Sequence, residues 1–363
     1  MIGIVGLGFM GMTHFTAAKA SRRVKVAAFA TRNAKKRAGD WSSIQGNFGP
    51  RGEKETDLLG ATPYEDWRDL IADDRVRLVD ICTPTAQHEE IALAALAAGK
   101  DVLVEKPIAP TLKAADRMIR AAEKSEGRLM VAHVLPFFAE WRFALDTVRG
   151  GRYGRLLAGH LRRHIAPPAW SNDMASLEAV GGWGVDLHIH DNHFINLLCG
   201  PPTHVVATGL LEAPGDDAAA GAPRLVRHTE TQYRFEGVHA PALTASSGGI
   251  GCKSYEFVSG YELFLEKATL SFSAGTYDGQ WVVDRPVTLA PARGPMRQPT
   301  LKGGTEWYSP FQNELEAAYE CTRGGPMRPE LDPHMAREAL AVCFAEAKSI
   351  ANGKIVKLPT AKS

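Results

Sequence analysis

One lysine stands at the end of a predicted strand, where acid–base chemistry is common. The apolar run Val102–Glu105 is typical of a short buried strand, and it stops at Lys106 and Pro107. Ligands of open α/β sheets collect at the carboxyl ends of strands. Partial burial, or a positively charged ring nearby, would lower the pKa of Lys106 from about 10.4 toward the range of a general acid or base. The alternative is an ordinary salt-bridged or exposed lysine.

A second candidate group lies in the segment GGWGVDLHIHDNHFINLLCG. Asp186 and His190 are four residues apart, so on a helix they share a face, and His193 follows three residues later on that face. A carboxylate beside an imidazole fixes the tautomer of a general base and stabilises its charged form. The same three residues could instead form a face with two histidines and one carboxylate for zinc or iron. His188 falls on another face, and we expect it to be a structural or interface histidine.

A glycine pattern follows the first predicted strand. Gly6, Gly8 and Gly11 form G-x-G-x-x-G, with Phe9 and Met10 inside the pattern, directly after an apolar run and at the start of a helix. Backbone without side chains allows a pyrophosphate to approach the amides of a helix N-terminus. The pattern therefore predicts dinucleotide binding, although a tight glycine turn can also be purely structural.

The end of the second predicted strand indicates which dinucleotide is bound. Thr31 lies about 20 residues past the last glycine, where an NAD enzyme often has an acidic residue. Thr31 cannot repel a ribose 2′-phosphate, and Arg32, with Lys35 or Lys36 nearby, could bind one as a cation. We therefore expect NADP to be preferred over NAD. The alternative role for Arg32 is stacking on the adenine, or simple solvation.

Composition narrows the class of protein. The 363 residues suggest about two domains, and 45% hydrophobic with 23% charged residues is ordinary for a globular chain. The formal net charge of +1 offers no positive field for nucleic acid or an anionic membrane. The five cysteines are an odd number and widely spaced, and no stretch approaches the roughly 20 apolar residues of a membrane span. We expect a soluble cytoplasmic protein that binds neither nucleic acid nor membrane.

The first 132 residues alternate short apolar runs with helical stretches, which predicts a doubly wound, parallel Rossmann sheet of the α/β class. The predicted strands are Ile2–Val5, Val24–Ala30, Leu78–Cys82, Val102–Glu105 and Leu129–Ala132. Helices are predicted over Pro63–Ala72, with Pro63 as the first helical residue, and over His88–Ala98. The stretch Asp40–Gly60 is a long loop of the kind that is often functional.

Residues 133–363 predict an α+β domain with a large, mostly antiparallel open sheet for substrate binding and oligomerisation. One helix is predicted over Gly182–Leu198. The predicted strands are Arg224–Phe235, Ala242–Ser247, Tyr255–Ser259, Glu262–Phe272 and Gln280–Leu289, with glycine-containing breaks between them. The helical segments Phe311–Thr322 and Pro333–Asn352 are expected to pack back across this sheet. We expect its other face to be apolar and uncovered, and hence a homodimer or homotetramer.

Together these motifs resemble the Gfo/Idh/MocA oxidoreductases, relatives of glucose-fructose oxidoreductase and inositol dehydrogenase. The resemblance spans nearly the whole chain. It rests on GLGFMG, on ICTPTAQHEEIALAALAAGKDVLVEKP, on GG-x-x-x-D-x-x-x-H at Gly181 to His190, and on the closing PFQNELEAAYECTRGG and AREALAVCFAEAKSIANGKIVKL.

The resemblance implies roles for residues that already stand out. Lys106, Asp186 and His190 would surround the nicotinamide and the substrate hydroxyl, and the Lys106–Pro107 bond would be cis. The implied cofactor contacts, added to those of the glycine loop, are Thr83, Pro84, His88, Glu105 and Lys106. Because the family motif accounts for Asp186 and His190, we expect no metal site.

Three departures from the family pattern limit what can be carried over. His193 stands where many relatives have an aspartate, the loop Asp40–Gly60 is longer than usual, and Pro136 replaces a frequent arginine. Candidate substrate contacts, besides Lys106, Asp186 and His190, are His193, Arg163 and Trp170, with Arg162 beside them. The two arginines and Trp170 could equally be sheet-surface or packing residues.

The function that follows is hydride transfer between NADP(H) or NAD(H) and a secondary alcohol or ketone of a sugar, sugar derivative or cyclitol. His190 would take the hydroxyl proton while Asp186 orients its imidazole. One alternative is a redox-neutral glycosidase or lyase that oxidises its substrate transiently and keeps its nicotinamide bound. Another is a non-enzymatic dinucleotide sensor, although the presence of Lys106, Asp186 and His190 together argues against it.

Overall fold

The computed structural model describes residues 1–46, 48–167, 181–212 and 225–358. Contacts divide the chain into two compact units. The first unit contains Met1–Ala139 and Gly303–Arg337, and the second contains Glu140–Lys302 and Glu338–Ser363. A division into folding domains at residues 132 and 133 stays a prediction. Within the described ranges, no helix combines the length and apolar character needed to cross a membrane.

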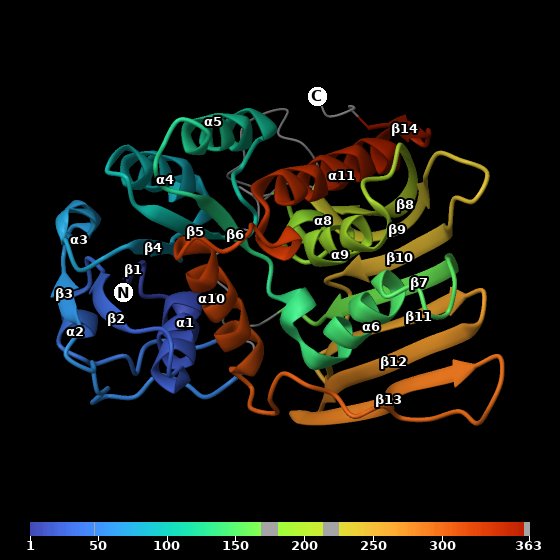
Figure 1. Cartoon of the computed structure of the whole chain (residues 1–363), viewed down its shortest axis with the longest axis horizontal. Helices are drawn as coiled ribbons and strands as arrows, with labels where there is room; N and C mark the ends of the chain where they lie inside the picture. The colour runs from blue at the N-terminus through green and yellow to red at the C-terminus, as the bar shows by residue number, and fades with distance from the viewer. Residues whose placement is uncertain (47, 168–180, 213–224, 359–363) are drawn as a thin grey trace. The chain divides into compact units, whose positions relative to one another are not determined.

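The first unit is built on a six-stranded parallel sheet in the order β3-β2-β1-β4-β5-β6 (Figure 1). This order confirms the predicted Rossmann sheet, since the chain starts in the middle and winds to both edges. The strands are β1 (Ile2–Val5), β2 (Val26–Ala30), β3 (Thr62–Tyr64), β4 (Leu78–Ile81), β5 (Asp101–Glu105) and β6 (Leu129–Ala132).

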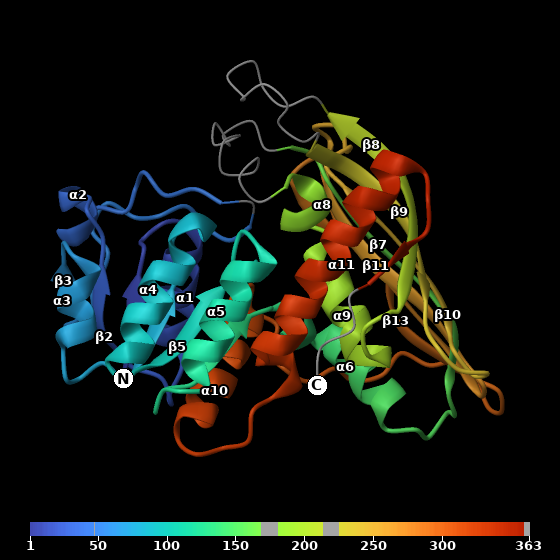
Figure 2. The same ribbon diagram turned by 90° about the horizontal axis from the view of Figure 1, so that it is seen from above.

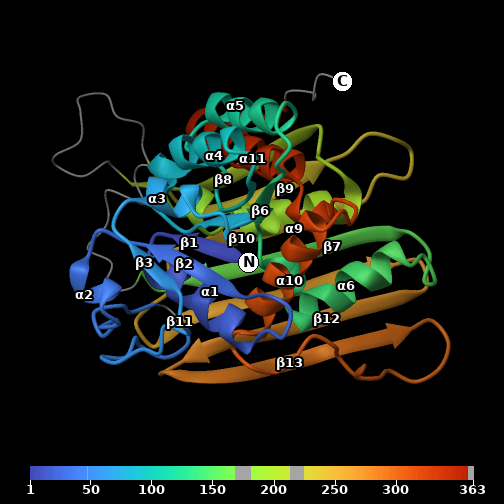
Figure 3. The same ribbon diagram turned by 60° about the vertical axis from the view of Figure 1, so that its left-hand side comes forward.

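Helices cover both faces of this sheet. α1 lies beside α10 on one face, and α3, α4 and α5 pack in a row on the other (Figure 3). Their bounds are α1 (Phe9–Ala20), α2 (Ala34–Arg37), α3 (Trp67–Ala72), α4 (His88–Ala97), α5 (Leu112–Ala122) and α10 (Ser309–Thr322). Short 3₁₀ turns lie at η1 (Thr85–Gln87), η2 (Leu135–Phe137) and η3 (Pro329–Leu331).

The position of α10 corrects one expectation. This helix was expected to pack across the large sheet, but it packs on α1, and Phe311 and Leu315 share a buried core with Phe15 and Ile4 of the first unit. Helical periodicity shows that a helix has an apolar face, but it does not say which surface that face covers. The late segment of the chain therefore completes the Rossmann unit.

The predicted helix Pro63–Ala72 is also corrected. Pro63 lies in β3, at the edge of the sheet, and the helix begins four residues later at Trp67. The side chain of Asp66 accepts a hydrogen bond from the backbone N–H of Arg68 and caps that helix. Proline is tolerated in an edge strand because it removes a donor only where no neighbour needs it. Both Thr62–Pro63 and Asp66 are cap signals, and the aspartate is the one used.

The second unit is built on an eight-stranded sheet in the order β13-β12-β11-β7-β10-β9-β8-β14. Its neighbouring strands are antiparallel except β7 and β10, which confirms the mostly antiparallel sheet. The strands are β7 (Leu156–Ile165), β8 (His204–Glu212), β9 (Leu225–Arg234), β10 (Ala242–Gly248), β11 (Tyr255–Leu265), β12 (Ala268–Tyr277), β13 (Gln280–Pro291) and β14 (Val356–Lys357).

One predicted strand break is wrong. Gly260 was expected to separate two strands, but it lies inside β11, and the chain turns later, at Glu266 and Lys267. A Cβ on Gly260 would overlap the carbonyl oxygen of Phe272 on the neighbouring strand. This glycine therefore allows close strand approach rather than a turn.

The two faces of this sheet differ. Figure 2 shows α6 (Ala139–Arg149), α8 (Trp183–Asp186), α9 (Ile189–Cys199) and α11 (Pro333–Asn352) along one face. Strand alternation places the even-numbered residues of β7 on the opposite face. There His160 bonds Thr244, Arg162 donates to Ser273, and the side chains of His164 and Ser246 are hydrogen-bonded. The expectation of an apolar face is therefore wrong along these strands, where polar side chains pair with one another.

Candidate active site

The three glycines of the loop between β1 and α1 differ in what a side chain at each position would meet. Gly6 has φ 94°, and a Cβ there would lie 2.8 Å from the carbonyl oxygen of Cys82. A Cβ on Gly11 would overlap the carbonyl oxygen of Gly6. A Cβ on Gly8 would meet nothing within 4 Å, and no side chain caps the N-terminus of α1. The space above Gly8, next to uncapped helix amides, fits a dinucleotide pyrophosphate.

Cationic side chains gather where β2 ends. Thr31 is half-buried and Arg32 is exposed. Lys36 is held against the glycine loop, since its Nζ donates to the carbonyl of Leu7 at 2.7 Å, and burial lowers the pKa of this lysine. Arg37 donates to the carbonyl of Thr31 at 2.8 Å. The strand end thus has a fixed backbone and an accessible guanidinium at Arg32, as a ribose 2′-phosphate site requires.

The long loop Asp40–Gly60 is anchored near its start by Trp41 and contacts the glycine loop through Phe48. Trp41 is buried, with its ring 4.9 Å from the Phe15 ring. Phe48 lies edge-on to Phe9 at 4.6 Å. Phe9 and Met10 are partly buried against the core of the unit. Their side chains therefore support the glycine loop from behind and leave its backbone amides as the groups available to a ligand.

The corner after β5 is held by side chains on both sides. The peptide bond between Lys106 and Pro107 is cis, as the resemblance implies. The Lys106 backbone N–H donates to Oε2 of Glu105 at 3.0 Å. The buried ring of His88 spans two carbonyls, with Nδ1 3.1 Å from the oxygen of Pro107 and Nε2 2.9 Å from that of Thr83. His88 thus connects the ends of β4 and β5. It positions the segment 105–107, which we call the lysine corner.

Asp186 and His190 stand out in their segment by exposure. The helix predicted over Gly182–Leu198 is broken, because α8 ends at Asp186 and α9 begins at Ile189. From Gly182 to Leu197 the residues are buried, apart from Asp186 and His190, which are partly exposed. The four-residue spacing does not lie within one continuous helix. The two side chains are nevertheless the accessible ones of this segment.

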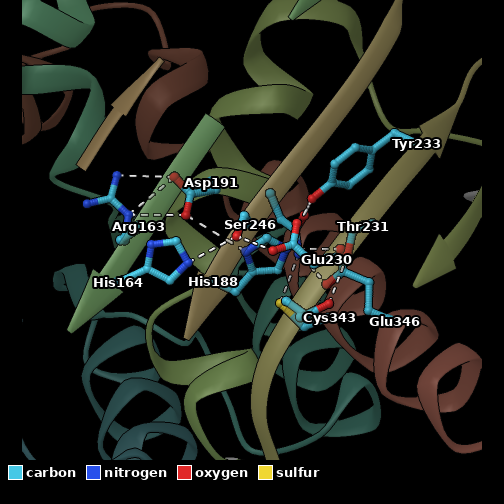
Figure 4. A network of polar contacts seen from close by, with 12 residues as sticks. Arg163, His164, His188, Asp191, Glu230, Thr231, Tyr233, Ser246, Cys343 and Glu346 are labelled. Carbon is cyan, nitrogen blue, oxygen red and sulfur yellow. Dashed lines mark hydrogen bonds and ion pairs between the residues drawn. The ribbon is translucent and has the colours of Figure 1, made fainter. Parts of the chain in front are cut away.

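His188 lies between them and faces the interior of its own unit (Figure 4). Its Nε2 lies 3.1 Å from Oε1 of Glu346 on α11 and 3.1 Å from the Tyr233 hydroxyl on β9. Burial alone would lower the pKa of His188, but the charge of Glu346 and the hydrogen bond with Asp191 raise it to about 9. His188 is therefore a structural imidazolium, one of the two roles expected for it.

Arg163 belongs to the same network. It is buried, and Nε and Nη2 donate to the Asp191 carboxylate at 3.2 Å, while its guanidinium lies 5.2 Å from the centre of the Trp141 ring. This geometry gives no support to a substrate contact for Arg163. The expectation is weakened because β7 alternation turns this arginine toward α9 and its neighbour Arg162 toward the opposite face.

The other substrate candidates differ in position. His193 is fully buried, and desolvation with the nearby charge of Arg149 lowers its pKa to about 3, so its imidazole is neutral. Burial does not favour a substrate contact there. Trp170 lies outside the described residues.

The structure places the expected catalytic residues in two units. Lys106 belongs to the first, and Asp186 and His190 belong to the second. Their convergence over one nicotinamide stays a prediction.

The comparison with family models adds a likeness to this geometry. A model described as "Oxidoreductase family, NAD-binding Rossmann fold", named GFO_IDH_MocA, matches residues 1–133. Through these residues the chain is similar to the Gfo/Idh/MocA oxidoreductases.

The curated proteins that this chain resembles include a catabolism protein and inositol dehydrogenases. The chain is 30% identical over 230 residues to the rhizopine catabolism protein MocA of Rhizobium meliloti, covering 62% of this chain and 65% of that protein. It is 32% identical over 193 residues to inositol 2-dehydrogenase 2 of Saccharopolyspora erythraea, covering 51% and 52%. The chain thus spans between about half and two thirds of the length of these relatives.

Levoglucosan dehydrogenase in complex with NADH is similar over 99% of both chains, with a TM-score of 0.78 and 19% identity. At this identity the likeness shows the fold, and it confirms a Rossmann unit followed by a mostly antiparallel sheet.

Three residues were missed by sequence reasoning. His14, Asp80 and Glu314 are buried together near Glu105. Lys36 was considered only as one of two lysines near Arg32. Signals for the first two exist. His14 follows Gly11 by three residues on the same helix, and Asp80 is a lone acid in the otherwise apolar strand LVDI. Burying a carboxylate is costly unless it is paired, so a lone acid in an apolar strand predicts a partner nearby.

Proposed function

We propose that this protein transfers hydride between NADP(H) and a secondary alcohol or ketone of a sugar, sugar derivative or cyclitol. The observation that carries the proposal is the pairing, within one unit, of an open glycine cradle at Gly8 with a lysine corner at Lys106. The names of the relatives, inositol dehydrogenase and levoglucosan dehydrogenase, support a polyhydroxylated substrate.

The chain would divide the chemistry as follows. The nicotinamide, when bound, accepts or donates the hydride. His190 takes the proton of the substrate hydroxyl during oxidation, Asp186 orients and charges its imidazole, and Lys106 holds the substrate oxygen. The partial exposure of Asp186 and His190 supports these roles, because a proton acceptor must reach its substrate.

The proposal is tested by replacing Lys106 and His190 with alanine. We expect turnover to fall by about 10²-fold or more in each variant, with the dissociation constant of the cofactor little changed. Lys113→Ala, which removes an exposed lysine on α5, is the control. A panel of sugars and cyclitols is followed by nicotinamide absorbance and product together. Full turnover in Lys106→Ala would contradict the assignment, and product without net cofactor reduction would identify a redox-neutral glycosidase or lyase.

The preference for NADP over NAD is tested at Arg32. Arg32→Ala should raise the dissociation constant of NADP by about tenfold or more and leave that of NAD unchanged, because a charged hydrogen bond to the 2′-phosphate is lost. Arg22→Ala, an exposed arginine elsewhere in the unit, should change neither. Fluorescence titration with both cofactors measures this. A clear preference of the unmodified protein for NAD would refute the role of Arg32.

We also propose that the chain forms a homodimer or homotetramer through the helix-free face of the large sheet. Phe264 and Val282, on β11 and β13, share that face with His164 by strand register and are 43% and 41% exposed, which supports a partner for these strands. Light scattering that gives a monomer of 39.3 kDa would refute this.

A further inference from the structure

A histidine in the Rossmann unit is surrounded by carboxyl groups from three other elements. His14 lies on α1, and the acids are Asp80 on β4, Glu105 on β5 and Glu314 on α10. Nδ1 of His14 lies 2.9 Å from Oδ2 of Asp80, and Nε2 lies 3.3 Å from Oε1 of Glu105 and 3.9 Å from Oε2 of Glu314. The side chains of His14, Asp80 and Glu314 are fully buried, and that of Glu105 is 10% exposed.

The surroundings favour a charged imidazole. Nδ1 is hydrogen-bonded to Asp80, whereas Nε2 has no hydrogen-bond partner among the described residues and faces the Glu105 carboxylate at ion-pair distance. A neutral ring would turn a lone pair toward one of these two carboxylates. Burial by itself lowers the pKa of His14, but the charge and hydrogen bond of Asp80, with a smaller contribution from Cys82, raise it well above its ordinary value. His14 is therefore a buried cation between acids.

His14 carries one positive charge beside three carboxyl groups. We infer that one of these groups, Glu314, keeps its proton. Among the described residues neither of its carboxyl oxygens has a hydrogen-bond partner. Full burial, with the charges of Glu105 and Asp80 nearby, raises the pKa of Glu314 well above its ordinary value, against the opposing charge of His14. A neutral carboxylic acid avoids a third negative charge in this space.

Cys82 also lies in this group, and ligand atoms of His14, Asp80 and Cys82 lie within 4.8 Å of one another. The sulfur of Cys82 lies 3.5 Å from Nδ1 of His14 and 3.7 Å from Oδ1 of Asp80. Burial and the charge of Asp80 raise the pKa of this thiol, so it stays protonated. Metal binding would require a thiolate and a ring nitrogen without a proton, so a charged His14 and a bound metal are competing states of this group.

The group is connected to the lysine corner through Glu105. One oxygen of that carboxylate faces Nε2 of His14, and the other accepts the backbone N–H of Lys106. We propose that His14 is a charged positioning residue, which holds the Glu105 carboxylate against the backbone of Lys106, with neutral Glu314 filling the remaining side of its ring. This inference rests on the proposed role of Lys106 and extends it to residues that do not touch the substrate.

The first experiment replaces His14 with glutamine, which keeps a donor and removes the charge. We expect kcat to fall about tenfold or more, while KM for the cofactor changes by less than about threefold. The kcat–pH profile should also change, because a buried positive charge beside the backbone of Lys106 is removed. A lower melting temperature with an unchanged kcat and pH profile would overturn the proposal.

Asp101→Asn is the matched control, because Asp101 is a buried acid at the other end of β5. Its carboxylate accepts the backbone N–H of Arg128 at 2.9 Å and pairs with Arg77, away from the lysine corner. This variant should lower the melting temperature and leave the pH profile unchanged. A change of the pH profile in Asp101→Asn as large as in His14→Gln would show that any buried charge in this strand matters equally, and would overturn the specific role of His14.

A second measurement needs neither a variant nor activity. Nitrogen NMR of histidine-labelled protein at pH 8 should show both ring nitrogens of His14 carrying protons. A neutral ring at pH 8, or stoichiometric zinc in the purified protein, would overturn the inference. If the sugar panel shows no hydride transfer while His14 is charged, the proposed function fails and the charged network stands. If His14 is neutral while Lys106→Ala is inactive, the reverse holds.

Discussion

The two units each contain a buried network of a histidine and carboxyl groups, and the two networks differ in their count of charges. In the second unit, two cations, Arg163 and His188, meet two carboxylates, Asp191 and Glu346. In the first unit, among the ion pairs described, the cation His14 meets three carboxyl groups, Asp80, Glu105 and Glu314. We call the network around His188, with equal numbers of cations and carboxylates, the balanced set or balanced network. The network around His14, with more carboxyl groups than cations, is the acid-rich set or acid-rich network.

The difference decides what each network can do. In the balanced set Asn192 also donates to Glu346 at 2.8 Å and accepts from the Tyr233 hydroxyl at 2.7 Å, so these polar groups are bound to one another. Such a network fixes α9 between β7, β9 and α11, and with it the exposure of His190. In the acid-rich set one proton must be shared, so its structure depends on where that proton lies.

Breaking the balanced network should have the largest effect. Glu346→Gln leaves the buried His188 without its main counter-charge, which we expect to lower the free energy of unfolding by about 3 kcal/mol or more. Urea unfolding measures this. Glu266→Gln, which removes a charge from the more exposed pair with Arg155 in the same unit, is the control and should change stability little. A loss in Glu346→Gln no greater than in the control would mean that the network is not stabilised by charge.

Alkaline pH should weaken the same network without a substitution. The pKa of His188 is raised from 6.5 to about 9, so its contribution to stability is fully present below pH 6.5 and is lost as pH rises through 9. At about 1.4 kcal/mol per pKa unit the loss is about 3 kcal/mol. Unfolding free energies at intervals from pH 6 to 10 measure it. Glu346→Gln should flatten this dependence, and an equally steep curve in that variant would assign the titration to another group.

The sequence predicted where helices and strands lie better than it predicted which surfaces they pack against. The glycine loop and four of the predicted parallel strands are where periodicity placed them, because a strand buried on both faces is written as a continuous apolar run. Two predictions were wrong. α10 was assigned to the large sheet, and a helix was predicted to begin at Pro63. Periodicity carries no information about the surface a helix covers, and two cap signals close together cannot be ranked by type alone.

The candidate site shows the same limit. Lys106, Asp186 and His190 were found because their types and spacing suggest chemistry. His14 and Glu314 are about 300 residues apart in the chain, so only the fold brings them together. The substrate contact predicted for Arg163 gains no support from the structure, because a strand residue can face either side of the sheet and alternation alone does not say which face the helices cover.

The smallest effect is expected when the same type of substitution, glutamate to glutamine, is made in the acid-rich network. Glu314→Gln exchanges a neutral acid for a neutral amide of the same shape, so we expect the free energy of unfolding to fall by less than about 1 kcal/mol. The NMR signal of charged His14 should also remain. Urea unfolding beside Glu346→Gln measures the contrast. Equal losses in the two variants would mean that Glu314 is ionised, and the two networks would then differ in position but not in the way their charges are balanced.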